Sequence, residues 1–267
     1  MRKQWITMLL MVFMVFAATT PAQAEDGISA SGDIGAFNAY NWRGAPQTTD
    51  KVAVQGDVGL ALPLGPGELS ASVWASNTFA SPAPQFAGRD AVEFDWTLDY
   101  SGSFGDSGLG YTLGGIYYTY LRDSTANFVE VYGGLSLDAR ISPFVTVYYT
   151  VADSSIAVNN LNESGDLWID VGAGASFLGA DWSATFSFAF YDADPTRTAD
   201  ILAGQFDDGA SVITLGVSKD FEVNDLTITP SITAYIPIAN KAPGDNKRYI
   251  YNTIAENDVV FGVNVAF

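Results

Sequence analysis

The sequence predicts an all-β fold: a transmembrane antiparallel up-and-down β-barrel of twelve strands, forming a single domain over residues 25–267. Three observations predict it. The N-terminus has the features of an export signal, apolar residues recur with a period of two along the rest of the chain, and short and long connections alternate between the apolar segments.

Composition removes several classes of protein. The 267 residues include 30 Asp and Glu against 12 Lys and Arg, 13% aromatic residues, and no Cys or His. So many aromatic residues are untypical of a disordered acidic chain, and a disulfide or zinc-finger scaffold needs cysteine. Without imidazole, a Ser-His-Asp triad and His-based metal sites cannot form, so we expect no enzyme, no catalytic residues, no metal and no cofactor. The acidic balance also argues against nucleic acid as a partner.

Residues 1–24 form a separate unit. Arg2 and Lys3 precede the apolar run 6–18, which is followed by small residues ending at Ala24. This pattern predicts a cleaved secretory signal peptide. No later segment reaches the roughly 18 apolar residues of a membrane-spanning helix, so a membrane would be crossed by strands.

The strands are predicted from the alternation of apolar and polar residues. Within 92–101, apolar or aromatic residues occupy every even position and polar or acidic residues every odd one. Twelve such segments are expected, at 28–43, 51–64, 67–79, 91–104, 108–121, 127–138, 143–152, 165–177, 181–192, 210–221, 225–236 and 258–267. Most are longer than the usual strand of about 5 to 6 residues and suit a tilted strand crossing a bilayer.

The connections and the C-terminus favour an outer-membrane barrel of a Gram-negative bacterium. Short turns, such as 65–66 and 222–224, alternate with longer loops, such as 80–90 and 193–209, as periplasmic turns alternate with extracellular loops. The last segment has apolar residues on one parity and ends at Phe267, an ending that the barrel assembly machinery recognises. The alternative is a soluble β-sandwich or lipocalin-like barrel, which buries one face and rarely keeps this loop alternation over twelve strands.

Aromatic residues near the segment ends are expected at the two membrane interfaces, in contact with lipid. They are Phe104, Phe177, Trp182, Phe221 and Phe267 near the short turns, and Tyr40, Trp42, Tyr120, Tyr149 and Tyr191 near the long loops.

If the apolar parity faces lipid, the other parity faces the lumen, because charges facing hydrocarbon are unfavourable. The expected pore-lining residues are Asp33, Arg43, Asp57, Trp74, Glu93, Asp95, Asp99, Glu130, Tyr132, Asp166, Trp168 and Asp170. Basic residues are nearly absent from the strands, so the lumen is predicted to be acidic, with Arg43 as its principal cation, paired with Glu93 or a neighbour. The simpler alternative is that these residues are merely solvated positions of a wet barrel.

A twelve-stranded lumen is intermediate between a filled barrel and a wide channel, and inward aromatic residues would narrow it further, so small solutes or ions are the expected cargo. The loops 193–209 and 237–257 could fold inward or remain at the surface. Acidic pairs such as Asp207-Asp208 lack the frame of a calcium site.

One stretch resembles a known family. The run Tyr40-Asn41-Trp42-Arg43-Gly44 with Gln47-Thr48 is similar to the Tyr-x-x-Arg-Gly-x-x-Gln opening of the TorF family, small porin-like outer-membrane proteins of Gram-negative bacteria. Further blocks follow in the same order: 54–56, 73–77, 93–95, 114–118 and 130–135. The resemblance spans about 40 to 135 and implies a porin-like role without a defined substrate or catalytic residues.

Three functions are compatible with these patterns. The leading hypothesis is a passive diffusion channel for small cationic or neutral solutes, with ion selectivity set by lumen carboxylates. A plugged structural or adhesive barrel without transport activity is the alternative. An outer-membrane phospholipase or other lipid-modifying enzyme is the third, and the lack of His disfavours it.

Overall fold

Twelve antiparallel strands form a closed ring, as the sequence predicts. The computed structural model describes residues 27–48, 52–79, 90–121, 124–152, 164–177, 181–192, 209–238, 248–250, 253–255 and 257–267. The ring consists of β1 (Ser29–Phe37), β4 (Ala53–Leu64), β5 (Gly67–Phe79), β6 (Asp90–Ser103), β7 (Leu109–Leu121), β8 (Phe128–Leu137), β9 (Ser142–Ala152), β10 (Leu167–Phe177), β11 (Trp182–Asp192), β12 (Gly209–Lys219), β14 (Leu226–Pro237) and β17 (Asp258–Ala266).

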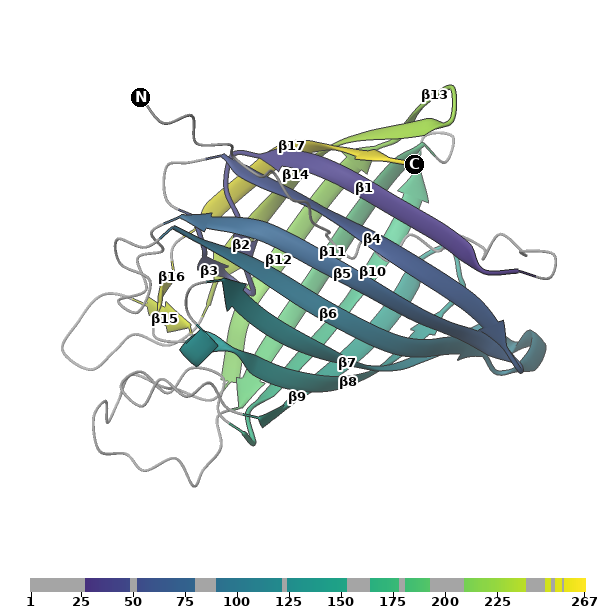
Figure 1. Ribbon diagram of the computed structural model, residues 1–267, viewed down its shortest axis with the longest axis horizontal. Helices are drawn as coiled ribbons and strands as arrows, with labels where there is room; N and C mark the ends of the chain where they lie inside the picture. The colour runs from purple at the N-terminus through teal and green to yellow at the C-terminus, as the bar shows by residue number, and fades with distance from the viewer. Residues whose placement is uncertain are drawn as a thin grey trace.

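Each strand pairs with its neighbours along the chain, and β1 closes the ring against β17 (Figure 1). In this closing pair Asp33 lies opposite Ala266 and Phe37 opposite Gly262. Just beyond the paired residues, Phe267 N donates a hydrogen bond of 3.0 Å to the Gly32 carbonyl. Closure leaves no free sheet edge, which is the condition for a sheet to exist in hydrocarbon.

The remaining elements are shorter and are not among the twelve strands of the ring. They are β2 (Asn41–Trp42), β3 (Ala45–Pro46), β13 (Phe221–Val223), β15 (Arg248–Ile250), β16 (Thr253–Ala255) and two 3-10 turns, η2 (Gly105–Ser107) and η3 (Ser124–Ala126). β2 pairs with β3 and β15 with β16, while β13 pairs with residues 226–228 of β14, beyond the part of β14 that pairs with β12. No helix among the described residues is long and apolar enough to span a membrane.

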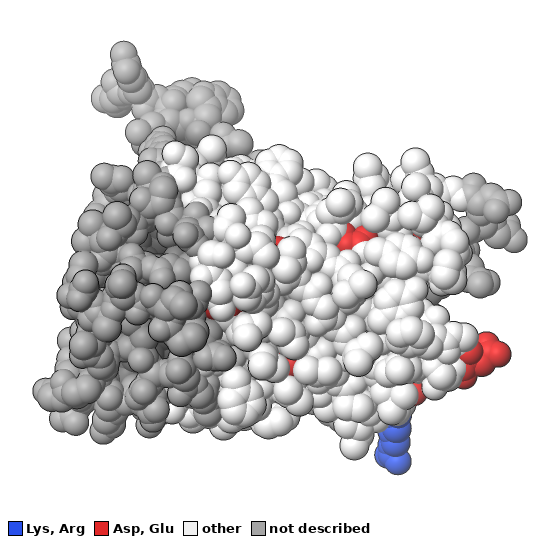
Figure 2. Space-filling model, turned by 90° about the horizontal axis from the view of Figure 1, so that it is seen from below, with Lys and Arg blue, Asp and Glu red and all other residues white. Residues whose placement is uncertain are grey.

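The outer wall is apolar. Residues on the outward parity of different strands are more than half exposed, for example Leu60 (57%), Leu98 (57%), Ile232 (58%) and Phe261 (57%). Figure 2 shows one side of this wall: the described surface is mostly uncharged, with a few acidic atoms within it and the protruding charged side chains at the end away from the grey residues. On the inward parity of the same strands, Gln55, Thr97 and Val260 are buried. A period-two sequence therefore becomes an apolar belt outside and a mixed surface inside.

The first predicted segment, 28–43, is too long. β1 ends at Phe37 because Asn38 takes over the hydrogen bonds of the next ladder position: its Nδ2 donates to the Val259 carbonyl (3.1 Å), and its Oδ1 accepts from Phe261 N (2.7 Å). The chain then leaves the wall, and residues 41–46 form the β2–β3 hairpin instead of continuing the strand.

Two further predictions involve residues outside the described part of the chain. The signal peptide, residues 1–24, lies there entirely, and so does 193–208 of one long loop. In the other long loop, 237–257, the described part includes β15 and β16, and β16 lies against β3.

Outward leucines should be intolerant of charge. Leu98→Arg places a guanidinium on the lipid side, so it should lower the free energy of unfolding in phospholipid vesicles by about 2–4 kcal/mol. Ser70→Arg adds the same charge to the inner wall beside Asp99 and is the matched control. Denaturant titration followed by tryptophan fluorescence measures both variants, and an equal loss for the two would contradict the assignment of faces.

Candidate functional site

The β2–β3 hairpin reaches into the loop end of the barrel. Its two-residue turn is Arg43-Gly44, and both residues have positive φ, 51° and 85°. Two consecutive positive φ values define the tight type I′ hairpin turn. Glycine adopts this conformation freely, whereas Arg43 is strained in it, so contacts of its side chain must hold it there.

Hydrogen bonds close the base of the hairpin. Gln47 N donates to the Tyr40 carbonyl and Tyr40 N to Thr48 Oγ1, both over 2.7 Å. On one side, Asn41 Nδ2 donates to Asp258 Oδ2 of β17 over 3.2 Å. The hairpin is thus a short, tied structure and not an open loop.

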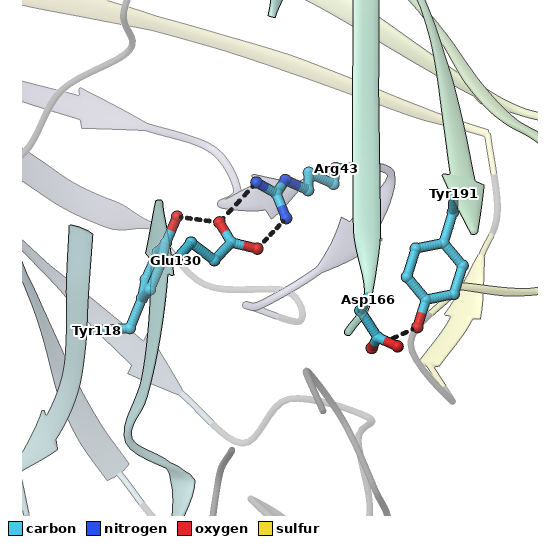
Figure 3. Close-up of polar contacts among 5 residues, drawn as sticks. All are labelled: Arg43, Tyr118, Glu130, Asp166 and Tyr191. Atoms are coloured by element: carbon cyan, nitrogen blue, oxygen red, sulfur yellow. Dashed lines mark hydrogen bonds and ion pairs between the residues drawn. The ribbon is translucent and has the colours of Figure 1, made fainter. Parts of the chain in front are cut away.

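Arg43 forms a bidentate ion pair with Glu130 of β8. Its Nη1 lies 2.8 Å from Glu130 Oε1 and its Nη2 lies 2.8 Å from Oε2 (Figure 3). The Tyr118 hydroxyl of β7 donates a third hydrogen bond to Oε2 over 3.1 Å. The side chains are 10% and 2% exposed, so the pair is largely removed from water. Geometry of this kind is the strongest arrangement of an arginine and a carboxylate.

Aromatic rings surround the guanidinium. Its Cζ lies 4.7 Å from the ring centroid of Trp42, 4.6 Å from Tyr148 and 5.1 Å from Trp168, all within the range of a cation–π contact. The Tyr118 and Phe128 rings stack on each other, with their centroids 4.1 Å apart, and both contact the Trp42 ring. Rings from the hairpin and from the wall therefore form one packed layer around the Arg43–Glu130 pair.

Two more carboxylates near the loop end are held by tyrosines. Glu93 Oε1 accepts from the Tyr120 hydroxyl and Asp166 Oδ2 from the Tyr191 hydroxyl, each over 2.8 Å (Figure 3 for Asp166). Glu93 and Asp166 are each 3% exposed. These bonds fix carboxylates on the inner wall that would otherwise be costly to remove from water.

The remaining predicted carboxylates also lie on the inward parity. Asp33 and Asp57 interact electrostatically across β1 and β4. Asp99 of β6 lies opposite Ser70 and Gly114, and Asp170 of β10 lies opposite Thr146. A Cβ on Gly114 would come within 2.6 Å of the Tyr132 ring, so this glycine is what lets Tyr132 lie across β7 toward Asp99.

The predicted pore-lining residues that lie on strands are all on the inward parity, and one detail of the prediction is wrong. Arg43 lies on the hairpin and not on β1. Of the partners expected for it, Glu93 or a neighbour, it pairs with the neighbouring Glu130 of β8. Trp74 packs its ring against Tyr40, with centroids 5.3 Å apart. Whether the twelve residues line an open path stays a prediction.

The expected lipid contact of several loop-end aromatic residues is wrong. Tyr40 and Tyr191 are only 4% and 5% exposed, Trp42 packs on Tyr118 inside the barrel, and Tyr120 binds Glu93. Among the others, Phe104, Tyr149, Phe177, Phe221 and Phe267 are exposed as predicted. The prediction for Tyr40 and Trp42 is wrong because it extends the alternation of β1 past Phe37, where the strand ends. The signal that could have found the hairpin is Gly44, since glycine readily supplies the positive φ that a tight hairpin turn needs.

Comparisons with known proteins agree on the architecture. Residues 21–229 match a family model described as "Bacterial protein of unknown function (Gcw_chp)". That model does not carry the TorF name, so the TorF resemblance stays a prediction. No curated protein matches the sequence.

Solved structures of similar fold include both a porin and a phospholipase. The NanC porin has a TM-score of 0.51 at 11% identity, covering 90% of this chain and 99% of that chain. An active-site mutant of outer membrane phospholipase A from Escherichia coli has a TM-score of 0.50 at 13% identity, covering 92% and 94%. The Salmonella typhi phospholipase dimer with bound calcium has a TM-score of 0.50 at 12% identity, covering 91% and 93%. At such low identity these similarities establish the barrel fold alone.

Breaking the ion pair should destabilise the barrel. Arg43→Met leaves the buried Glu130 carboxylate without its cation, so the free energy of unfolding should fall by about 3–5 kcal/mol. Adding Glu130→Gln removes that unpaired charge, so the double variant should lose less than the sum of the single variants. A double-mutant cycle by denaturant titration measures this, and Arg140→Met, in an exposed short turn, should change stability by less than about 0.5 kcal/mol. Additive losses would show that the two side chains do not depend on each other.

Proposed function

We propose that this chain, which belongs to the Gcw_chp family of bacterial proteins, is an outer-membrane porin-like channel for the passive diffusion of small solutes, with a preference for cations. The outer membrane of a Gram-negative bacterium is the place for such a barrel, because its apolar belt needs lipid.

The charge of the inner wall is the observation that carries this proposal. Asp33, Asp57, Asp95, Asp99 and Asp170 face inward on five different positions of the ring. Among the side chains that the structure describes, the basic residue that reaches the interior is Arg43, and Glu130 already neutralises it. Carboxylates on a low-dielectric wall attract cations and repel anions over the length of the path.

The β2–β3 hairpin is the element that would set the size limit. It brings Tyr40, Trp42 and Arg43 to the interior, where they meet Trp74, Tyr118 and Trp168 of the wall. Solutes crossing the barrel must pass this layer, so the channel would admit small solutes only. The same packing is what favours the second candidate, a barrel plugged at its loop end that serves a structural or adhesive role.

The charge preference can be measured directly. In planar bilayers with a KCl gradient, the wild-type protein should give a reversal potential of the sign for K⁺ permeation. Neutralising four inner-wall groups together, D33N/D57N/D99N/D170N, should move that potential toward zero because the attraction for cations is lost. Anion preference in the wild type, or an unchanged potential in the variant, would reject cation selectivity by these carboxylates.

A variant without the hairpin distinguishes the two candidates, the open channel and the plugged barrel. Tyr40 and Gln47 are already hydrogen-bonded, so replacing residues 41–46 by Gly-Gly keeps the base of the hairpin. Single-channel conductance should rise in this variant if the hairpin is the constriction. N224G/D225G, in the short turn at the opposite end, is the matched control and should leave conductance unchanged. A wild type that is folded yet electrically silent, with current only in the hairpin variant, would favour the plugged barrel.

A further inference from the structure

Among the side chains that the structure describes, carboxylates outnumber cations around the hairpin. Asp95 of β6 interacts electrostatically with Glu93, Glu130 and Arg43. Arg43, however, directs both of its terminal nitrogens at Glu130. Glu93 and Asp95 are an acidic pair, two residues apart on the same face of β6, and among the described residues no cation forms an ion pair with either of them.

Both members of this pair have an oxygen without a regular hydrogen bond. The Glu93 side chain is 3% exposed and has hydrogen bonds from Tyr120, to Oε1, and from Tyr40, whereas its Oε2 atom is buried without a partner at hydrogen-bond geometry. Asp95 Oδ1 is likewise buried and without a partner. A buried carboxylate oxygen left unsatisfied is unfavourable, and a bound positive group would relieve it.

Aromatic side chains surround the same two carboxylates. Tyr40 and Tyr120 each interact electrostatically with both Glu93 and Asp95. Trp74 is the cross-strand neighbour of Asp95, and its ring contacts that of Tyr40. Carboxylate oxygens beside aromatic faces are the groups that bind ammonium and guanidinium ions.

The protein already binds one guanidinium in this manner. Arg43 is held by one carboxylate and three rings within the same layer of the barrel. A metal ion fits the Glu93–Asp95 pair less well, because among the described residues no three acidic, His or Cys side chains converge as metal ligands.

We propose that Glu93 and Asp95 form a binding site for the cationic group of a small organic solute, a primary ammonium or a guanidinium, at the hairpin. This deepens the proposed channel function, on which it rests for the route by which the solute arrives. It assigns the class of solute that would bind on its way through: a small organic cation, held by the two carboxylates with Tyr40 and Trp74 alongside.

Binding can be tested without conduction. Methylguanidinium chloride and methylammonium chloride would be titrated into detergent-folded protein at constant ionic strength, with tryptophan fluorescence and calorimetry as readouts. Wild type should bind at least one of them saturably, and E93Q/D95N should weaken that binding by about tenfold or more, since hydrogen bonds to charged groups are being lost. Asp220→Asn is the control: Asp220 is exposed at the far end, bonded to Thr229, and its loss should leave binding unchanged.

Two results would overturn the proposal: no saturable binding of either cation to the folded wild type, or equal affinity in wild type and E93Q/D95N. Heat-modifiable migration on gels verifies folding, and Asp95→Asn alone serves if the double variant does not fold. The titration needs no current, so its result is independent of conduction. Binding by an electrically silent protein would reject the channel and support the site. Conduction by a protein that does not bind the cations would support the channel and reject the site.

Discussion

The hydrogen-bonded closure of β1 against β17 is the constraint on which the rest of the molecule depends. A sheet edge in hydrocarbon would leave backbone groups without partners, each at a cost of several kcal/mol, so the ring must close completely. Once it is closed, each strand has one face toward lipid and one toward the interior. The exposed Leu60 and Leu98 and the inward Asp57 and Asp99 are consequences of the same pleat.

Closure also creates an interior that side chains or water must fill, and the side chains at the loop end differ from those on the rest of the inner wall. At the loop end the hairpin inserts rings and one ion pair, with Arg43 held at a strained φ by Glu130 and three aromatic faces. Elsewhere the inner wall has small neighbours, such as Gly114 and Ser70 beside Asp99. The interior thus combines tightly packed side chains at the loop end with carboxylates beside small neighbours farther along the wall.

Arg43 links the packing of the hairpin to the negative charge beside it. Its ion pair neutralises Glu130 and fixes the hairpin, while no cation among the described side chains forms an ion pair with Glu93 or Asp95 beside it. An element that restricts the interior therefore also leaves negative charge beside it. A charged group that both narrows a path and sets the local potential is a common way of obtaining selectivity for small ions and solutes.

The sequence by itself determined the barrel, because a period of two over twelve segments and the alternation of turn lengths are local properties of the chain. It also determined which carboxylates face inward, since parity along a strand decides this for Asp33, Glu93 and Asp170 alike. Only the tertiary structure decided where β1 ends, that Tyr40 and Trp42 turn inward, and that Arg43 pairs with Glu130. The physical reason is that Arg43 and Glu130 are 87 positions apart, so their meeting depends on the closed ring and on the turn at Gly44, and no local periodicity encodes such a contact.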